Sequence, residues 1–254
     1  MLTKNEIKLI NSLSIKKYRD NYKLFVVDGH KIVSEIVDST FEIEFLIHTK
    51  DFIPINHRAS KIVEVSEDEI KKISNFNSPP NVIVIVKIPD KQLSIKELKD
   101  KLTLSIDAIQ DPGNLGTIIR ICDWFGIENL ILSKNSVDLY NSKVIQATMG
   151  AFLRVNVFYT DLEKFIIDYK SQTNNQCYGA FLEGENIYNL QKPKNCLLVM
   201  GNEGNGISQQ VENQIDKKIF IPPFNPNNHS ESLNLSVATA IVCNEFRLTR
   251  YHAT

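Results

Sequence analysis

The sequence predicts an α/β protein with two domains, the second of which is built on a mostly parallel sheet. From residue 102 onwards, apolar strand-length runs alternate with helix-length runs, which is the pattern of a parallel sheet covered by helices. Some strand-length runs, such as 82–86 and 197–200, are entirely apolar, so both of their faces are expected to be buried. A polar, highly charged stretch separates the two regions. We therefore assign residues 1–88 to a small domain, 89–101 to a linker and 102–254 to the second domain.

The individual elements follow from periodicity and capping signals. In the first domain, Ser66 and Glu69 form a capping box that opens a short helix toward Phe76. Strands are expected there at 24–27, 43–48, 61–65 and 82–86, and a helix where Ile32, Val33, Ile36 and Val37 recur at helical spacing. In the second domain, strands are expected at 102–107, 129–132, 153–159, 176–181, 196–200 and 218–221, and helices at about 114–125, 141–149, 161–171, 208–214 and 232–248.

Composition excludes several classes of protein. The chain has 254 residues with 43% hydrophobic and 23% charged residues, which is ordinary for a globular protein. No apolar run approaches the roughly 18 residues of a membrane helix, and residues 1–6 lack an apolar signal core. The four cysteines, at 122, 177, 196 and 243, include no CxxC pair and lie near no histidine cluster, which argues against a metal site. We expect a cytoplasmic protein with reduced thiols, no metal and no membrane contact.

The charge is balanced except at the start of the chain. Lys and Arg number 29 and Asp and Glu number 30, so the net charge of 29 − 30 = −1 excludes nucleic-acid binding by bulk electrostatics. Residues 1–23 carry six basic and two acidic side chains, or 6 − 2 = +4. A solvated helix face is the simpler interpretation. The other is a patch that follows a phosphate backbone, made of Lys16, Lys17, Arg19 and Lys23.

Three loops of the second domain carry residues suited to chemistry. The first, 111–116, follows a strand; its Asn114 is a good N-cap, and Arg120 lies six residues further among apolar residues. The second, 201–207, has three glycines, which allow a ligand to approach the backbone and its N–H groups. The third includes Ile221 and Pro222, a polar loop and a helix start near Ser232 and Asn234. Taken singly, each loop has a simpler explanation: a salt-bridged or snorkelling arginine in the first, a tight turn in the second and helix caps in the third.

Taken in order, the three loops resemble the motifs of a known family. Asp-Pro-Gly-Asn-Leu-Gly-x-Ile-x-Arg at 111–120, Gly-Asn-Glu-Gly-x-Gly-Ile at 201–207, and Ile-Pro followed by Glu-Ser-Leu-Asn-x-Ser-x-Ala at 221–238 resemble the SpoU (TrmH) family of RNA ribose methyltransferases, within the SPOUT class. The resemblance covers 102–254. It extends more loosely to 17–19 and 25–31, which look like the start of a small α/β RNA-binding domain of ribosomal-protein type.

The resemblance implies a fold, a cofactor and a reaction. The second domain would carry a deep trefoil knot, and the chain would form a homodimer whose active site draws on both subunits. S-adenosylmethionine would be the methyl donor, and a ribose 2′-hydroxyl of RNA the acceptor. The positions that match the family's cofactor site are Gly201, Asn202, Glu203, Gly204, Ile221, Pro222, Ser232, Leu233 and Asn234. Those that match or adjoin its catalytic group are Asn114, Arg120, Glu203, Ser232 and Asn234.

The roles of the side chains follow from their chemistry. Because a guanidinium stays protonated in proteins, we assign Arg120 to binding the RNA phosphate and stabilising alkoxide charge, with Glu203 and Ser232 orienting or relaying the proton. The small N-terminal domain favours ribosomal RNA over tRNA as substrate. The alternatives are a tRNA ribose methyltransferase and a catalytically idle protein that binds RNA or assists ribosome assembly. His229 lies in the polar loop beside the third motif, and we expect that it takes no part in the function of the site.

Overall fold

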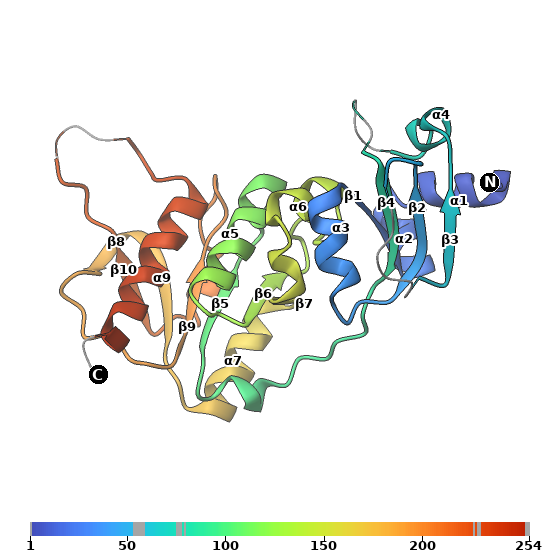
Figure 1. Cartoon of the computed structure of the whole chain (residues 1–254). Helices are drawn as coiled ribbons and strands as arrows, with labels where there is room; N and C mark the ends of the chain where they lie inside the picture. Colours follow the sequence, from blue (N-terminus) through green and yellow to red (C-terminus); the bar gives the residue numbers. More distant parts are fainter. Residues whose placement is uncertain are drawn as a thin grey trace. The chain divides into compact units, whose positions relative to one another are not determined.

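The computed structural model describes residues 2–52, 59–74, 78, 80–225, 227 and 230–251, so Phe76 and His229 lie outside the described residues. The chain forms two compact units (Figure 1). The first comprises Met1–Lys91 with Asp138–Leu153, and the second comprises Gln92–Val137 with Arg154–Thr254. None of the described helices has the length and apolar character needed to cross a membrane.

The first unit is built on a four-stranded mixed sheet. Its strand order is β1 (Leu24–Asp28), β4 (Val82–Lys87), β2 (Ile43–His48) and β3 (Lys61–Glu64). β4 runs antiparallel to both neighbours and β2 runs parallel to β3. The helices are α1 (Lys4–Ser12), α2 (Lys16–Tyr22), α3 (His30–Val37) and α4 (Glu67–Lys71). The predicted capping box of Ser66 and Glu69 opens α4, which ends at Lys71.

A later segment of the chain completes the core of this unit. Asp138–Leu153, which contains α6 (Ser142–Thr148) and the 3₁₀ turn η2 (Ala151–Leu153), belongs to the first unit, although the sequence places it within 102–254. The ring of Phe25 on β1 lies 4.5 Å from that of Tyr140 and 6.1 Å from that of Phe152. These aromatic contacts bury side chains that a free loop would leave exposed. The first unit is therefore discontinuous in sequence.

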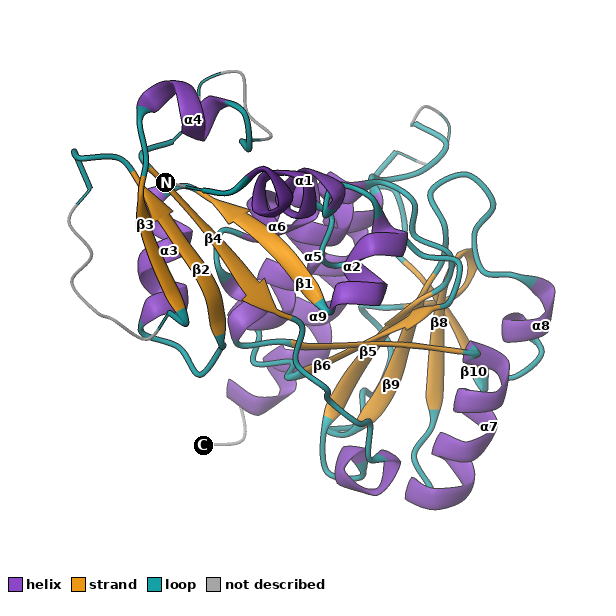
Figure 2. Ribbon diagram, turned by 90° about the vertical axis from the view of Figure 1, so that its right-hand side faces the viewer, coloured by secondary structure: helices purple, strands orange, loops and turns teal. Residues whose placement is uncertain are grey.

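The second unit is a six-stranded parallel sheet, as expected. The strand order is β10 (Lys217–Phe220), β8 (Cys177–Asn186), β9 (Cys196–Met200), β5 (Leu102–Ile106), β6 (Asn129–Ser133) and β7 (Asn156–Thr160). Every neighbouring pair is parallel. Its helices are α5 (Pro112–Trp124), α7 (Leu162–Thr173), α8 (Gln209–Glu212) and α9 (Leu235–Tyr251), with the 3₁₀ turn η1 (Ile95–Leu98). Figure 2 shows the strands of this sheet side by side, with helices around them.

Both faces of this sheet are covered. Leu197 and Val199 of β9 pack on the α7 side with Phe165, Ile166 and Tyr169. On the other side, α5 and α9 pack against each other (Figure 1) and bury Ile118, Cys122, Cys243 and Phe246. All four cysteines are free and buried, and burial raises the pKa of the Cys243 thiol to about 12. These thiols are part of the hydrophobic core.

Two helices begin two or three residues away from the expected position, whereas the other helices of 102–254 begin within one residue of it. α5 begins at Pro112, and Asp111 caps it by accepting a hydrogen bond from the Asn114 N–H at 2.6 Å. The prediction of Asn114 as the N-cap was therefore wrong, because aspartate is an equally good cap and proline is favoured at the first helical position. α9 begins at Leu235 rather than 232, so Ser232 lies outside it. The trefoil knot stays a prediction, because strand order and pairing do not define how a chain threads.

Candidate active site

The first two motif loops leave the sheet at the same edge. β5 and β9 are adjacent and parallel with Ile106 opposite Met200, so the residues that follow them start side by side. The Asp107 N–H donates to the Met200 carbonyl at 2.9 Å, which continues the pairing one residue further. Ligands of open parallel sheets bind beyond the carboxyl ends of the strands. The loops that carry Asn114 and Glu203 are therefore placed where a ligand site is expected.

The glycine loop after β9 is a tight turn that leaves no room for side chains at its base. A Cβ at Gly201 would lie 2.3 Å from the Gly206 carbonyl carbon and 2.5 Å from the Ile207 nitrogen. Asn202 and Gly206 exchange two backbone hydrogen bonds, at 2.8 and 3.0 Å. The Asn202 Oδ1 accepts from the N–H groups of Gly204 and Asn205. These four N–H groups are used inside the loop, so they are not the free donors that the sequence suggested.

A hydrogen-bonded chain of side chains joins the three motifs. The Asn114 Nδ2 donates to the Glu203 Oε1 at 3.0 Å, and the Asn234 Nδ2 donates to the Asn114 Oδ1 at 3.0 Å. Asn114 lies on α5, Glu203 in the glycine loop and Asn234 just before α9, so the three residues are far apart in sequence. The Asn234 Oδ1 accepts from the Ser236 N–H at 2.9 Å and thereby caps α9. Asn114 is the centre of this cluster.

Residues that the motifs do not include hold the loops in place. The Asn202 Nδ2 donates to the Ala108 carbonyl at 2.7 Å, and the Ala108 N–H donates to the Ser133 Oγ at 2.6 Å. Ala108 has φ of 55°, a left-handed conformation that costs about 1 kcal/mol outside glycine. The Asp107 Oδ2 accepts from the Ser208 N–H at 2.9 Å. Sequence reasoning missed Asp107, although a carboxylate at the carboxyl end of a buried parallel strand was the available signal.

The remaining cofactor candidates form a partly exposed surface. Ile221 and Pro222 are half-buried, and Leu233 is 47% exposed. Ser232 is exposed, and its carbonyl accepts from the Ser230 Oγ at 3.3 Å. None of these four residues joins the hydrogen-bonded chain of Asn114. The structure thus brings together Asn114, Asn202, Glu203 and Asn234, and it leaves the side chains of Ser232 and Leu233 free for a ligand.

Arg120 does not join the cluster around Asn114. Six residues along a helix correspond to a rise of about 9 Å and to a position about 120° away around the axis. Arg120 is exposed, and its guanidinium forms no hydrogen bond or ion pair with any residue that the structure describes. Glu203 is likewise exposed and has no basic partner in the described part of the chain. The Arg120 guanidinium and the Glu203 carboxylate, which were expected to act in one site, thus both lack an oppositely charged partner among the described residues.

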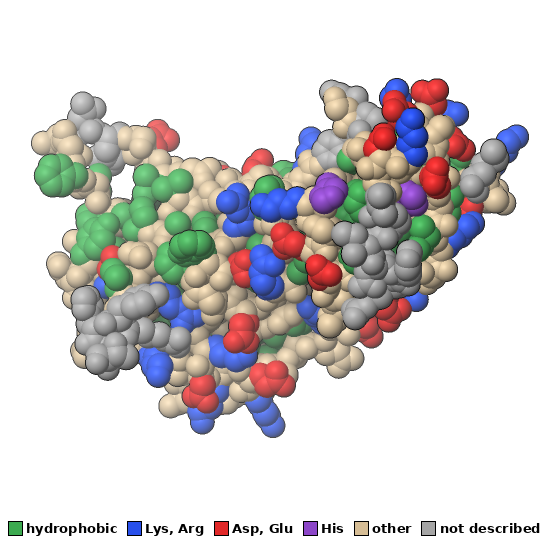
Figure 3. All heavy atoms as spheres, viewed as in Figure 1, with side chains coloured by type: hydrophobic (Ala, Val, Ile, Leu, Met, Phe, Trp, Pro, Cys, Tyr) green, Lys and Arg blue, Asp and Glu red, His purple; other side chains and the backbone are tan. Residues whose placement is uncertain are grey.

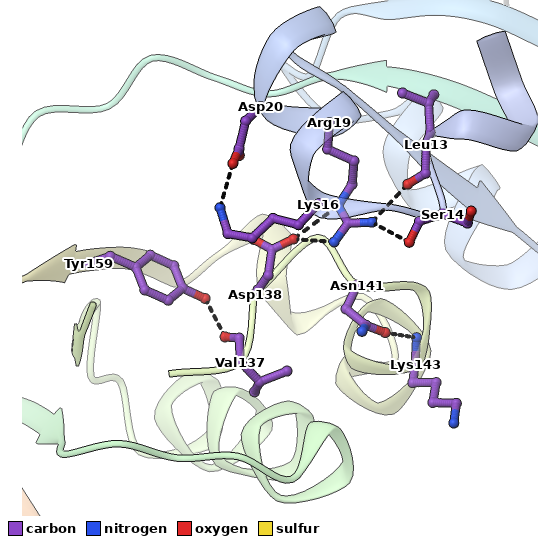
Figure 4. A network of polar contacts seen from close by, with 10 residues as sticks. All are labelled: Leu13, Ser14, Lys16, Arg19, Asp20, Val137, Asp138, Asn141, Lys143 and Tyr159. Atoms are coloured by element: carbon purple, nitrogen blue, oxygen red, sulfur yellow. Dashed lines mark hydrogen bonds and ion pairs between the residues drawn. The ribbon is translucent and has the colours of Figure 1, made fainter. Parts of the chain in front are cut away.

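Of the four basic residues assigned to RNA near the start of the chain, Arg19 is not available (Figure 4). It is 4% exposed, and its guanidinium contacts the Asp138 carboxylate at 2.7 and 3.0 Å. The same side chain donates to the carbonyls of Leu13 and Ser14 at 2.8 and 2.9 Å. Lys16, Lys17 and Lys23 are exposed, and Lys16 pairs with Asp20 at 2.7 Å. Arg19 is therefore an anchor of α2 and cannot grip a phosphate in this structure.

Within the described residues, no group of three or more His, Cys, Asp and Glu side chains could hold a metal ion. The candidate site consists of amides, one carboxylate, one separate guanidinium and apolar side chains. Such groups can position a substrate, stabilise charge and accept or donate a proton.

Comparison with known proteins agrees with this geometry. The profile of the SpoU rRNA Methylase family matches residues 101–244, and that of the MRM3-like substrate binding domain matches residues 4–84. The 23S rRNA (guanosine(2553)-2′-O)-methyltransferase RlmP of Bacillus subtilis is 27% identical over 245 residues, which cover 95% of this chain and 96% of RlmP.

Solved structures agree over the whole chain. A Porphyromonas gingivalis protein assigned to the TrmH family of RNA methyltransferases superposes with a TM-score of 0.89 at 35% identity, covering 98% of this chain and 99% of that one. An AdoMet-bound rRNA methyltransferase from Sinorhizobium meliloti superposes with a TM-score of 0.84 at 27% identity, covering 98% and 96%. The chain therefore belongs to the SpoU rRNA methylase family.

Proposed function

We propose that this protein transfers a methyl group from S-adenosylmethionine to a ribose 2′-hydroxyl of ribosomal RNA. The observation that carries the proposal is the hydrogen-bonded chain of Glu203, Asn114 and Asn234, which joins all three family motifs. Ribosomal RNA is favoured over tRNA because RlmP, which aligns over 95% of this chain, is named as a 23S rRNA enzyme. A catalytically idle RNA-binding protein is disfavoured because Asn114, Glu203 and Asn234 all match the family motifs.

The residues beside the cluster fit S-adenosylmethionine. A Cβ at Gly206 would meet nothing within 4 Å, and one at Gly204 would meet only the Asn202 Oδ1 at 3.7 Å, so the loop borders open space. Leu233, Ile221 and Pro222 offer apolar surface and backbone carbonyls for an adenine and a ribose. When bound, the cofactor supplies an electrophilic methyl group on a sulfonium, which becomes a neutral thioether as the ribose oxygen is methylated and loses its proton.

The chain's own residues position the RNA and handle charge. The Arg120 guanidinium binds a phosphate next to the target ribose and stabilises negative charge on the 2′-oxygen. Glu203 is an exposed carboxylate that can accept or relay the hydroxyl proton, and Asn114 fixes its orientation at 3.0 Å. The Ser232 hydroxyl orients the ribose. Lys16, Lys17 and Lys23 bind RNA phosphates on the first unit.

We further propose that the active site is shared between two copies of the chain. Arg120 lies on a different side of α5 from Asn114, so a single copy does not direct both at one substrate. The partner's Arg120 would supply the positive charge opposite the unpaired Glu203 carboxylate. A second copy would thus complete a site that one chain leaves incomplete.

Exposed apolar side chains support this pairing. Trp124 lies one turn beyond Arg120 on α5 and is 85% exposed, and Val237 at the start of α9 is 48% exposed. Since α5 and α9 are packed together, these side chains belong to one helical layer. Figure 3 shows apolar side chains on the surface of the second unit around α9. Large exposed apolar surface next to a helix pair is typical of an interface between subunits.

The experiment measures transfer of labelled methyl groups to ribosomal RNA that lacks the modification, with cofactor binding followed in parallel by calorimetry. We expect Arg120→Ala to lower transfer at least a hundredfold while cofactor binding stays within about threefold, because the guanidinium contacts RNA rather than cofactor. Arg120→Lys should remain strongly impaired, since an ammonium cannot form the bidentate contact.

Three results would contradict the proposal. Full transfer by the folded dimeric Arg120→Lys variant would remove the assigned role of the guanidinium. Absence of cofactor binding in the wild-type chain would favour the idle RNA-binding protein. Methylation of tRNA in preference to ribosomal RNA would overturn the substrate assignment.

A further inference from the structure

We infer that the exposed face of α2 is a stacking surface for unpaired RNA bases, with Tyr18 and Tyr22 as the stacking side chains and Lys17 and Lys23 on the adjoining phosphates. The inference rests on the proposed function, because it assigns the kind of RNA that the first unit selects. It adds Tyr22, and it gives a specific role to Tyr18, which lies in the segment 17–19 that resembles the start of the RNA-binding domain.

α2 has an unusual exposure pattern for a helix of a globular unit. Arg19 is its only buried residue, whereas a helix on a sheet normally buries an apolar stripe. Tyr18 is 37% exposed and Tyr22 is 52% exposed. Large aromatic side chains on an otherwise polar helix contribute little to the core of the unit. Their exposure is more consistent with contact to another molecule.

The two rings form a preorganised pair. Tyr18 and Tyr22 are four residues apart and so share one side of the helix. Their ring centroids are 6.4 Å apart and the ring planes differ by 15°, so the faces are nearly parallel. Parallel aromatic faces present flat π-surfaces on which nucleobases stack irrespective of sequence. The pair therefore provides a stacking surface that requires little reorganisation.

Arg19 keeps this helix in place. Its guanidinium contacts the carbonyls of Leu13 and Ser14 and the carboxylate of Asp138, all within the first unit (Figure 4). The Arg19 Nε and Nη2 both donate to the Asp138 Oδ2, and a buried hydrogen bond between two charged groups is among the stronger polar interactions in proteins. Because this anchor holds the backbone of α2, the segment that carries Tyr18 and Tyr22 has a fixed position. Fixed positions reduce the entropy lost on binding.

The charge around the tyrosines fits a nucleic acid. Lys16 is paired with Asp20, but neither Lys17 nor Lys23 forms an ion pair with a described residue. Lys23 ends α2 with φ of 55°, one residue after Tyr22. Free ammonium groups beside aromatic faces match a phosphate backbone with accessible bases. Paired A-form RNA hides its base faces within the stack, so unpaired nucleotides are the substrate class that this surface selects.

The test uses the full-length protein and a 12-nucleotide single-stranded RNA carrying 2-aminopurine, with a fully paired duplex of the same length as the second probe. Tyr18→Leu/Tyr22→Leu keeps apolar bulk but removes the π-faces. We expect it to weaken single-strand binding at least tenfold, to change duplex binding less than twofold and to abolish the quenching of 2-aminopurine. Tyr18→Phe/Tyr22→Phe should bind as the wild type. Tyr188→Leu, which alters an exposed tyrosine of the second unit, is the matched control.

The salt dependence separates stacking from charge. The tyrosine variant should keep the slope of log binding constant against log salt concentration, whereas Lys17→Gln should lower that slope by about 0.7. Unchanged single-strand binding by the leucine variant would overturn the inference. So would an equal loss for both probes, or a change in oligomeric state with RNA binding intact, which would identify a protein partner. Cofactor binding by the tyrosine variant at wild-type affinity shows that the proposed function does not depend on this result.

Discussion

Asn114 is the residue on which the site depends, because its amide both donates and accepts. Its Nδ2 reaches Glu203 and its Oδ1 accepts from Asn234, each at 3.0 Å. This double role is possible because Asp111 caps α5 and so leaves the Asn114 side chain free. An aspartate at 114 could accept the bond from Asn234 but could not donate to Glu203.

Asn114→Asp is therefore expected to create a pH-dependent defect. Two carboxylates about 3 Å apart raise the folded-state pKa of the pair, so the stability of the variant falls as pH rises above about 4. We expect a loss of about 1 kcal/mol at pH 8 relative to wild type and a smaller loss at pH 4. Asn114→Ala, which adds no charge, should lose the same amount at both pH values. Urea unfolding at the two pH values measures the difference, and parallel pH profiles for both variants would contradict the explanation.

The glycine loop offers a matched pair of substitutions. An alanine at 201 would place its Cβ 2.3 Å from backbone of Gly206, whereas at 204 the nearest atom is a side-chain oxygen 3.7 Å away. Since backbone cannot move aside, we expect Gly201→Ala to cost about 2–3 kcal/mol of unfolding free energy. Gly204→Ala should change it by less than about 1 kcal/mol. Thermal unfolding measures both, and equal stability of the two variants would show that the loop is not closed at its base.

At the scale of residues, the sequence predicts which side chains belong to the candidate site better than it predicts which side chains contact one another. The motif order was sufficient to select Asn114, Glu203 and Asn234, which the structure does join. The same reasoning could not separate Arg19 from its lysine neighbours, because burial depends on Asp138, which lies 119 residues further along the chain. Nor could it identify Ala108 as a strained connection, since alanine carries no signal for a left-handed backbone.

At the scale of elements, α1 and β3 are joined by an ion pair whose contribution to stability depends on pH. The Lys61 ammonium on β3 lies 2.6 Å from the Glu6 carboxylate of α1. Together with the Thr3 backbone N–H, this hydrogen bond lowers the pKa of Glu6 to about 2. A lowered folded-state pKa means that the stabilisation is present above the unfolded pKa of about 4.3 and is lost as pH falls toward 2.

Glu6→Gln should therefore lose stability at neutral pH and approach the wild type at pH 2. The glutamine keeps the capping-box geometry with Thr3 but cannot carry the charge that pairs with Lys61. Lys61→Met should show the same convergence, because it removes the other half of the contact. The urea midpoint of each variant between pH 6 and pH 2 provides the measurement. A constant difference from wild type across this range would assign the effect to lost packing instead.

Most elements could be predicted because their periodicity is strong. The central strands β5, β6 and β9 of the second unit are buried on both faces, and the first residue of five of its six strands was predicted to within about two residues. The exception, β7, begins at 156 rather than 153 because the 3₁₀ turn Ala151–Leu153 uses the preceding apolar residues to cover Phe25. The position of this turn depends on a contact with Phe25, which lies far away in the sequence, and local periodicity does not encode such a contact.

For the molecule as a whole, the domain boundaries assigned from the sequence and the two compact units differ in one segment. The first stretch of the first unit ends at Lys91, within the charged stretch 89–101 that we assigned to a linker. Nothing local marks Asp138–Leu153 as a part of the first unit. Tyr140 and Phe152 look like core residues of either unit until their contacts with Phe25 are known.

The proposal that two copies of the chain share the active site makes a prediction that a monomer could not fulfil. Arg120→Ala and Asn234→Ala should each be inactive, because each removes one side of both sites. If Arg120 acts in the partner's site, a heterodimer of the two variants has one site with both residues intact. After random reassociation, half of the dimers are heterodimers, and each heterodimer has one working site out of two. About a quarter of the wild-type activity should therefore return on mixing.

Trp124 allows the association itself to be followed, because it is the only tryptophan in the chain and is 85% exposed in a single copy. In the dimer, its fluorescence should be protected from acrylamide, and Trp124→Glu should yield monomers without methyl transfer because they lack the second guanidinium. Quenching as strong as that of free tryptophan would exclude this face as the interface. Protected Trp124 without recovered activity on mixing would instead mean that Arg120 serves its own chain, although it lies about 120° around α5 from Asn114.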